Sequence, residues 1–131
     1  MVTRVTAVAK AQGSSGAGLR SVIYAGGPMY LADIIEAEAH FGPIFIQIYG
    51  QGECPMGITA LKRAEVSDRS HPDWKLRLAG VGRAQSGVEL RIGTPEGQPL
   101  PAGELGEIMV RGDAVMPGYW NNPQATAQTL K

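Results

Sequence analysis

The stretch Ser21-Val22-Ile23-Tyr24-Ala25-Gly26-Gly27-Pro28 is followed further along the chain by Ile44-Phe45-Ile46-Gln47-Ile48-Tyr49-Gly50-Gln51-Gly52. Each begins as a short apolar run of residues that favour β-structure and then reaches glycines. This is the pattern of a buried strand that enters a tight loop. The fold of the chain therefore depends on what joins these two predicted strands.

The segment between the strands has the pattern of an amphipathic helix. Pro28 suits a first helical turn, where its missing N–H costs nothing, and Gly42-Pro43 ends the helix. A strand, a helix and a strand with short joins predict a βαβ unit with a right-handed crossover and parallel strands. The loops Gly26-Gly27 and Gly50-Gln51-Gly52 would then share the sheet edge at which open α/β sheets bind ligands.

Composition excludes several classes of protein. The chain has 131 residues with 12 Lys+Arg and 12 Asp+Glu, so its zero formal charge gives no electrostatic reason to bind nucleic acid or an anionic membrane. No apolar run approaches the roughly 18 residues of a membrane-spanning helix, and Met1-Val2-Thr3-Arg4 opens no secretory signal. A single cysteine, Cys54, cannot form an internal disulfide. These features predict a cytoplasmic protein.

The N-terminal segment is predicted to be a helix followed by a connector. Residues 2–11 place valine and alanine at helical spacing. Residues 12–18 have the glycine spacing of a phosphate-binding P-loop, but Leu19-Arg20 stands where that motif requires Lys and Ser/Thr. We interpret residues 12–18 as a flexible connector.

The second half of the chain has the pattern of antiparallel β-structure. Residues 62–77 are charged and irregular, which predicts a surface loop. Residues 88–92 and 107–111 alternate apolar and charged side chains, which indicates half-buried strands in a hairpin or part of a small barrel. Asn122 and Pro123 predict the start of a short helix.

The predicted fold class is thus α/β, in two parts. Residues 1–60 would contain the parallel βαβ unit, and residues 61–131 an antiparallel β segment with a short C-terminal helix.

Several residues are candidates for chemistry. On the residues alone, the two glycine loops are equally well explained as tight turns or as a site where a flat or phosphorylated ligand approaches the backbone, beside Tyr49. Glu53 follows one loop, and a carboxylate there could hold Mg²⁺ against phosphate oxygens. Cys54 suggests a thiol nucleophile, although its neighbour is an acid and neither histidine is obviously placed as a base.

A helical acidic cluster is the other candidate. Asp33, Glu36, Glu38 and His40 could hold a metal ion, but a solvated helix face with a cation near its C-terminus is the favoured reading. His71 lies in a polar loop and is predicted to be on the surface.

Four motifs occur in order along the chain. They are Tyr24-Ala25-Gly26-Gly27-Pro28-Met29, Gln47-Ile48-Tyr49-Gly50-Gln51-Gly52-Glu53, Gly103-Glu104-Leu105-Gly106-Glu107-Ile108-Met109-Val110-Arg111-Gly112 and Gly118-Tyr119-Trp120-Asn121-Asn122-Pro123, with Gly82-Arg83 and Val88-Glu89-Leu90-Arg91-Ile92 between them. Across nearly the whole chain this order resembles the AMP-forming acyl-CoA synthetases and fatty-acid–CoA ligases of the adenylate-forming superfamily. The resemblance implies an internal fragment of the large N-terminal domain of such an enzyme.

The resemblance also implies a reaction and a set of ligands. A carboxylic or fatty acid attacks the α-phosphate of ATP to give acyl-adenylate and pyrophosphate, and coenzyme A then takes the acyl group. Carried over by position, the backbone of Gly26, Gly27 and Pro28, with Gly50 and Gly52 in the second loop, would line the nucleotide site. Tyr49 would pack on adenine, Gln47 would face its amino edge, and Glu53 would bind Mg²⁺.

The chain departs from the family pattern at several positions. The threonine usual before the glutamate is Gly52, the alanine of the first motif is Gly27, its first glycine is Ala25, and the serine before Gly82-Arg83 is replaced by Gly80. No segment matches the family's Ser/Thr/Gly-rich phosphate loop, its Thr-Gly-Asp ribose motif, or its small C-terminal domain with the catalytic lysine. The catalytic set would be incomplete, and we expect no adenylation by these residues alone.

The sequence therefore leaves three candidate functions. The first is a fragment of an acyl-CoA synthetase that carries part of the adenine and Mg²⁺ site. The second is a non-catalytic nucleotide-binding or assembly module, with an exposed sheet edge available for self-association. The third, ranked last, is a thiol hydrolase that uses Cys54.

Overall fold

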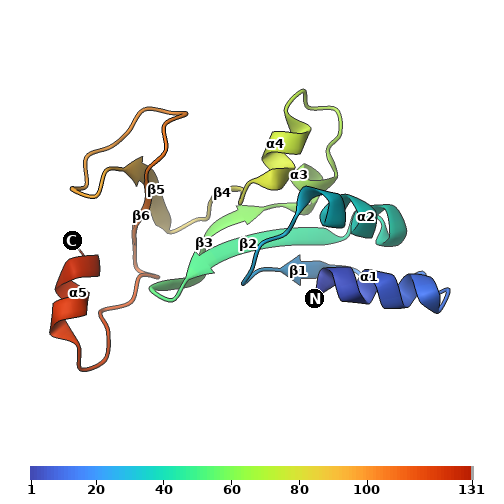
Figure 1. Cartoon of the computed structure of the whole chain (residues 1–131), viewed down its shortest axis with the longest axis horizontal. Coiled ribbons are helices and arrows are strands. Elements are labelled where there is room, and N and C mark those ends of the chain that lie inside the picture. Colours follow the sequence, from blue (N-terminus) through green and yellow to red (C-terminus); the bar gives the residue numbers. More distant parts are fainter. Residues whose placement is uncertain (131) are drawn as a thin grey trace. The chain divides into compact units, whose positions relative to one another are not determined.

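A computed structural model describes residues 1–130 as a mixed α/β fold (Figure 1). The elements in chain order are α1 (Val2–Ala11), β1 (Val22–Tyr24), α2 (Leu31–Phe41), β2 (Phe45–Gln51), β3 (Cys54–Leu61), α3 (Arg63–Ser67), α4 (Trp74–Ala79), β4 (Arg83–Ala84), β5 (Val88–Gly93), β6 (Glu107–Gly112) and α5 (Pro123–Thr129). Four strands form one sheet in the order β1-β2-β3-β4, and β5 and β6 form a second, two-stranded sheet.

The predicted parallel βαβ unit is confirmed. Strands β1 and β2 are parallel, with Val22 opposite Phe45 and Tyr24 opposite Gln47, and α2 is the crossover helix between them. The helix ends at Gly42, whose φ of 80° places it in the left-handed region that glycine adopts at little cost. The predicted N-terminal helix is also confirmed, because α1 spans residues 2–11.

The start of α2 differs from the prediction. Pro28 does not lie in its first turn, because the helix begins at Leu31 and Tyr30 is its N-cap in extended conformation. The carbonyl of Tyr30 accepts the first helical hydrogen bonds, from the N–H groups of Asp33 and Ile34. Residues 28–30 therefore belong to the segment that connects β1 to the helix.

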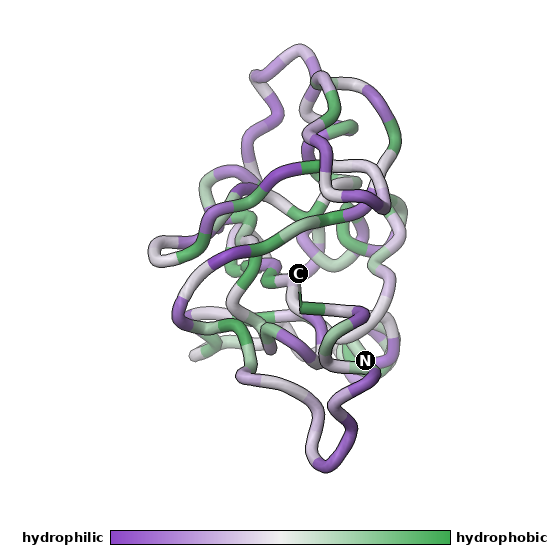
Figure 2. The backbone as a smooth tube through the Cα atoms, turned by 90° about the vertical axis from the view of Figure 1, so that its left-hand side faces the viewer, coloured by the Kyte–Doolittle hydropathy of each residue, from purple (hydrophilic) through white to green (hydrophobic). Residues whose placement is uncertain are grey.

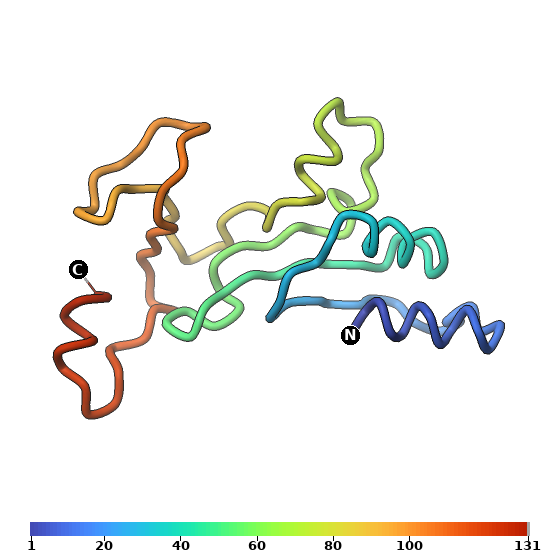
Figure 3. The backbone as a smooth tube through the Cα atoms, in the orientation of Figure 1, coloured from blue at the N-terminus to red at the C-terminus, as the bar shows by residue number. Residues whose placement is uncertain are grey.

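Strand β3 was not predicted from the sequence. It follows β2 after the turn Gly52-Glu53, and the backbone trace turns back tightly there (Figure 3). Two neighbouring strands joined by so short a turn are antiparallel. The strand carries Pro55, and Met56 has a φ of 54°, so the alternation that would reveal a strand is interrupted.

The charged segment 62–77 was predicted to be an irregular loop, and this is wrong. It contains the short helix α3 and the first residues of the short helix α4, which continues to Ala79. Charged side chains stabilise the segment locally, since the Arg77 guanidinium lies 3.7 Å from carboxylates of both Glu65 and Asp68. Helices of five and six residues leave too short a periodicity to recognise in a sequence.

The second half confirms the predicted antiparallel hairpin and C-terminal helix. Strands β5 and β6 are paired from Val88 opposite Gly112 to Gly93 opposite Glu107. The Asn122 side chain caps α5 by accepting a hydrogen bond from the Ala125 N–H at 3.1 Å. Leu90, expected to be half-buried by its alternation, is 36% exposed.

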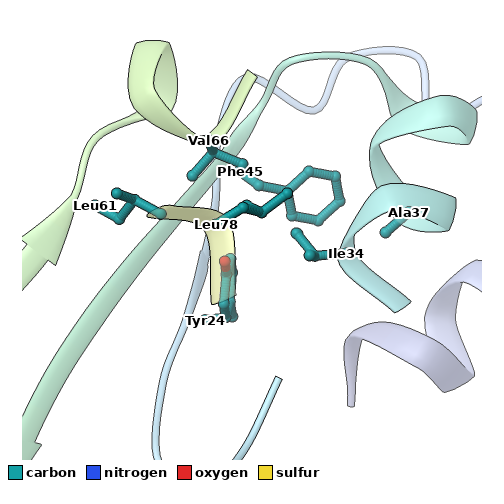
Figure 4. Packing of buried hydrophobic residues seen from close by; sticks show 7 residues of the cluster. All are labelled: Tyr24, Ile34, Ala37, Phe45, Leu61, Val66 and Leu78. Atoms are coloured by element: carbon teal, nitrogen blue, oxygen red, sulfur yellow. The ribbon is translucent and has the colours of Figure 1, made fainter. Parts of the chain in front are cut away.

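The chain divides into two compact units. The first comprises residues 1–49 and 59–83, and the second comprises residues 50–58 and those from 84 onward. The hydrophobic core belongs to the first unit, and Figure 4 shows its side chains converging. Its buried members are Tyr24, Ile34, Ala37, Phe45, Leu61, Val66 and Leu78. In the second unit the buried residues are Cys54, Ile58 and Gly93 among those described. The predicted division of the chain into residues 1–60 and residues 61–131 stays a prediction.

Hydropathy changes over short distances along the backbone, with hydrophobic and hydrophilic residues interspersed (Figure 2). Within residues 1–130, no helix has the length and apolar character needed to cross a membrane.

Candidate functional site

The loop Gly26-Gly27-Pro28 follows the carboxyl end of β1 and lines a cavity of about 510 Å³ within the first unit. Gly26 has a φ of 76°, so the turn itself requires glycine there. Gly27 has no such requirement, because a Cβ built on it meets nothing within 4 Å and its φ is not positive. The fold therefore explains one of the two glycines and leaves the second with open space above its backbone.

Gln47 and Tyr49 lie on one face of β2, since side chains two residues apart point the same way along a strand. Phe45 on the same face is buried in the core. Gln47 is 9% exposed, and its Oε1 has no hydrogen-bond partner among the residues that the structure describes. A buried carbonyl oxygen left unpaired costs about 1–3 kcal/mol. The parallel register places Gln47 beside Tyr24, just before the Gly26-Gly27 loop.

Gly50 and Gly52 belong to the second unit. The predicted loop Gly50-Gln51-Gly52 is wrong at its first two residues, because Gly50 and Gln51 are the end of β2 and the turn is Gly52-Glu53. A Cβ on Gly50 would stand 2.1 Å from the backbone nitrogen of Met56, so no other residue fits there without moving the strands. A Cβ on Gly52 would meet nothing within 4 Å, and its φ is not positive. Packing thus requires Gly50, as the positive φ requires Gly26, whereas neither packing nor φ requires Gly52 or Gly27.

Glu53 is held at this turn by the segment that precedes α5. The Tyr119 hydroxyl donates a hydrogen bond to Glu53 Oε1, and the Met116 N–H donates to the Glu53 carbonyl at 2.7 Å. The hydrogen bond from Tyr119, followed in importance by a backbone N–H, lowers the pKa of Glu53. Conversely, the hydrogen bond to Glu53 raises the pKa of Tyr119. Glu53 is thus an ionised, oriented carboxylate at a partly exposed turn.

A cavity of about 630 Å³ within the second unit adjoins Glu53. It is lined by residues of β3, β6 and the end of α5, including Cys54, Arg111 and Leu130. A carboxylate oxygen is the type of ligand that Mg²⁺ prefers, and Glu53 retains acceptor capacity beyond the one hydrogen bond from Tyr119. The chemistry of Glu53 therefore fits a divalent cation.

Tyr119 was not recognised as a site residue from the sequence. It belongs to a quoted motif, but its hydrogen bond to Glu53 spans 66 residues, and no local pattern predicts such a contact. Its position in the fourth motif was the available signal.

The structure does not assemble the alternative sites. The proposed acidic cluster on α2 is dispersed: Glu36 pairs with Lys10, Glu38 with Arg69, and His40 Nε2 lies 2.8 Å from the Ser14 carbonyl. Within residues 1–130 there is no group of three or more His, Cys, Asp or Glu side chains placed to hold a metal ion.

Cys54 is buried, at 2% exposed, so its thiol is not presented to a substrate. Burial disfavours a reactive thiol, because a nucleophilic cysteine must be accessible to its substrate. His71, the other isolated histidine, accepts a hydrogen bond from the Asp73 N–H at 3.1 Å in its own loop.

The sequence matches the profile of the AMP-binding enzyme family over residues 1–120. The chain belongs to this family. Among curated proteins, the chain is 35% identical over 113 residues to a feruloyl-CoA synthase of Amycolatopsis sp., covering 86% of this chain and 21% of that one. It is 36% identical over 113 residues to the medium/long-chain-fatty-acid–CoA ligase FadD8 of Mycobacterium tuberculosis, covering 86% and 19%.

Parts of solved structures have a fold similar to that of this chain. The amide bond synthetase McbA of Marinactinospora thermotolerans is 29% identical, with a TM-score of 0.83 over 99% of this chain and 25% of that one. ATP-bound MatB of Rhodopseudomonas palustris is 31% identical, with a TM-score of 0.66 over 82% and 20%. The chain spans about a fifth of the length of the curated relatives that it matches.

Proposed function

We propose that this chain carries part of the nucleotide site of an AMP-forming acyl-CoA synthetase. In the first unit, the Gly26-Gly27-Pro28 backbone lines the adenine pocket, Tyr49 packs on the ring, and Gln47 faces its amino edge. In the second unit, Gly50 and Gly52 shape the turn that follows and Glu53 binds Mg²⁺. Family membership and the positions of the four motifs support this assignment.

The observation that carries the proposal is the Gln47 Oε1, which has no hydrogen-bond partner within residues 1–130 and belongs to the register partner of Tyr24, two residues before Gly26. A fold gains nothing by burying a polar atom without a partner, so such an atom calls for an explanation. The terminal torsion of a glutamine side chain is soft, so a small rotation can turn its amide oxygen toward a hydrogen-bond donor on a bound ligand. The exocyclic amino group of adenine is a donor of the required kind.

The open space at Gly27 and Gly52 is a second support. Neither packing nor a positive φ requires glycine at these two positions. Glycine at such positions allows a ligand to approach the backbone closely, and backbone N–H groups can bind phosphate without a side-chain hydroxyl.

The parent reaction would activate an apolar carboxylic acid with ATP and transfer the acyl group to coenzyme A. The named relatives include ligases of coenzyme A with a fatty acid and with a feruloyl group.

This chain alone would not catalyse the parent reaction, since the chain matches about a fifth of the length of those relatives. Phosphoryl chemistry depends on cationic groups that stabilise the transferring phosphate. A pyrophosphate-release assay with ATP and a fatty acid should be silent, and sustained turnover would contradict this part of the proposal.

Adenine binding can be tested separately from activity. We expect AMP, titrated into ¹⁵N-labelled protein, to shift amide signals of residues 24–28 and 47–49 in NMR spectra. Tyr49→Ala should abolish these shifts, because the ring on which adenine packs is lost. Tyr30→Ala is the matched control, since Tyr30 is exposed elsewhere in the same unit. Absence of shifts at millimolar AMP, or equal shifts in Tyr49→Ala, would overturn the adenine assignment.

A second candidate, an assembly module, is favoured by apolar side chains exposed near the sheet edge of the first unit. Strand β1 is at the end of the sheet order, and Ile23 on it is 61% exposed. An uncovered edge strand with apolar neighbours is prone to pair with another copy. Light scattering of the wild type should show self-association that Ile23→Lys reduces. A monomer at high concentration would rule this candidate out.

A further inference from the structure

The segment from Met116 to Tyr119 attaches to Glu53 at two points. The Met116 N–H binds the Glu53 backbone carbonyl, and the Tyr119 hydroxyl binds the Glu53 carboxylate. The two contacts together orient the Glu53 carboxylate.

Tyr119 is itself fixed by the start of α5. Its backbone N–H donates to Thr126 Oγ1 at 2.9 Å, and the Thr126 hydroxyl donates to the Asn122 carbonyl at 2.9 Å. Gly118 permits this arrangement, because a Cβ there would lie 2.8 Å from the Thr126 methyl carbon. The phenol therefore reaches Glu53 from a backbone that is already anchored.

The turn that carries Glu53 contains little that could orient it. Gly52 has no side chain and stands in open space, and Glu53 is only partly buried. A carboxylate on such a turn would otherwise sample several rotamers, and fixing it before a ligand arrives reduces the entropy cost of binding.

We infer that Tyr119 is a positioning residue for the cation site at Glu53. This inference rests on the proposed function, in which Glu53 binds Mg²⁺. The Tyr119 hydroxyl occupies one lone-pair direction of Glu53 Oε1 and holds the carboxylate so that its remaining acceptor capacity faces a cation. Hydrogen-bond partners of metal ligands act in this way in other sites, and their loss weakens metal affinity about 10-fold or more.

The test uses Mn²⁺ alone as a paramagnetic probe of ¹⁵N-labelled protein. In the wild type, Mn²⁺ should broaden the amide signals of residues 52–54 and of Tyr119. Tyr119→Phe keeps the ring and removes the hydroxyl, and it should raise the Mn²⁺ concentration for half-maximal broadening about 10-fold. Tyr30→Phe is the matched control and should leave it unchanged. Glu53→Gln should abolish the broadening at these residues.

The outcomes separate the two proposals. If the wild type shows no broadening at residues 52–54, Glu53 binds no cation and both proposals are wrong for this site. If broadening is present and equal in Tyr119→Phe, the metal role of Glu53 stands and the positioning role of Tyr119 is overturned.

A second variant addresses the structural role of Tyr119. Thr126→Val removes the acceptor of the Tyr119 N–H while leaving the phenol in place. Were Tyr119→Phe to disturb the spectrum of the second unit, Thr126→Val should still show an intermediate weakening of Mn²⁺ binding. Unchanged binding in a folded Thr126→Val protein would then count against the inference.

Discussion

Tyr24 and Gln47 are register partners across β1 and β2, and each carries a buried polar atom that has no hydrogen-bond partner within residues 1–130. Tyr24 is 7% exposed and Gln47 is 9% exposed. The Tyr24 hydroxyl and the Gln47 amide oxygen are thus both unpaired on opposite residues, just before the glycine loop that follows β1. Each unpaired buried atom lowers the stability of the fold. Each atom leads to a different prediction.

Replacing Tyr24 by phenylalanine should not destabilise the protein. The change removes an unpaired hydroxyl and keeps the ring, which makes an edge-on contact with Phe45 at 6.4 Å between centroids. We expect the free energy of unfolding in urea at neutral pH to stay equal or rise by up to about 1 kcal/mol. A loss larger than that would show that the hydroxyl has a stabilising partner.

The same variant should change stability at high pH. Burial, and secondly the Glu38 carboxylate, raises the pKa of Tyr24 from 10.0 to about 12. Between these values the unfolded chain releases the Tyr24 proton while the folded chain keeps it, so the folded state loses stability as pH rises. The loss is about 1.4 kcal/mol per pH unit. The difference between wild type and Tyr24→Phe in unfolding free energy should therefore move in favour of the variant between pH 10 and 12, and a constant difference would contradict this.

Replacing Gln47 by methionine should separate stability from nucleotide binding. Methionine has a similar shape and no unpaired oxygen, so we expect stability within about 1 kcal/mol of the wild type. AMP binding, followed by NMR shifts at residues 24–28, should weaken at least severalfold, because the acceptor for the adenine amino group is gone. Equal binding in the two proteins would mean that Gln47 does not contact the base.

Gly50 at the end of β2 and Gly52 in the turn that follows should respond differently to replacement by alanine. Gly50→Ala places a Cβ 2.1 Å from the Met56 nitrogen and should disrupt the hairpin, seen as loss of amide dispersion for residues 50–58. Gly52→Ala meets no atom within 4 Å and should change stability by no more than about 0.5 kcal/mol. A well-folded Gly50→Ala protein would be the contrary result.

Two ion pairs of α2 offer a comparison of burial. The Glu38 side chain is 9% exposed and pairs with Arg69, whose guanidinium also lies 4.6 Å from the Trp74 ring centroid. Arg69→Met should destabilise the protein by about 2 kcal/mol, because Glu38 is left charged and largely buried. Lys10→Met breaks the pair with Glu36, in which both side chains are about half exposed, and should cost roughly 0–1 kcal/mol. Urea unfolding of both variants gives the comparison, and similar losses would refute the role of burial.

Local patterns predicted the parts of the fold whose evidence lies within one segment. The apolar runs at β1 and β2, the helix before Gly42 and the cap at Asn122 were recognised because each is set by neighbouring residues. Elements stabilised by irregular or distant contacts were not recognised. Strand β3, with Pro55 and the positive φ of Met56, and the short helices α3 and α4 are of this kind.

By itself, the sequence determined the parallel βαβ unit, the glycine loop that follows its first strand and the family to which the chain belongs. Only the tertiary structure decided which glycines packing requires, that Cys54 is buried, and that Tyr119 binds Glu53 across 66 residues of chain. The physical reason is the range of the interactions. Strand and helix propensities depend on a few neighbouring residues and can be read from the sequence. Burial and hydrogen bonds between distant segments form only when the chain folds.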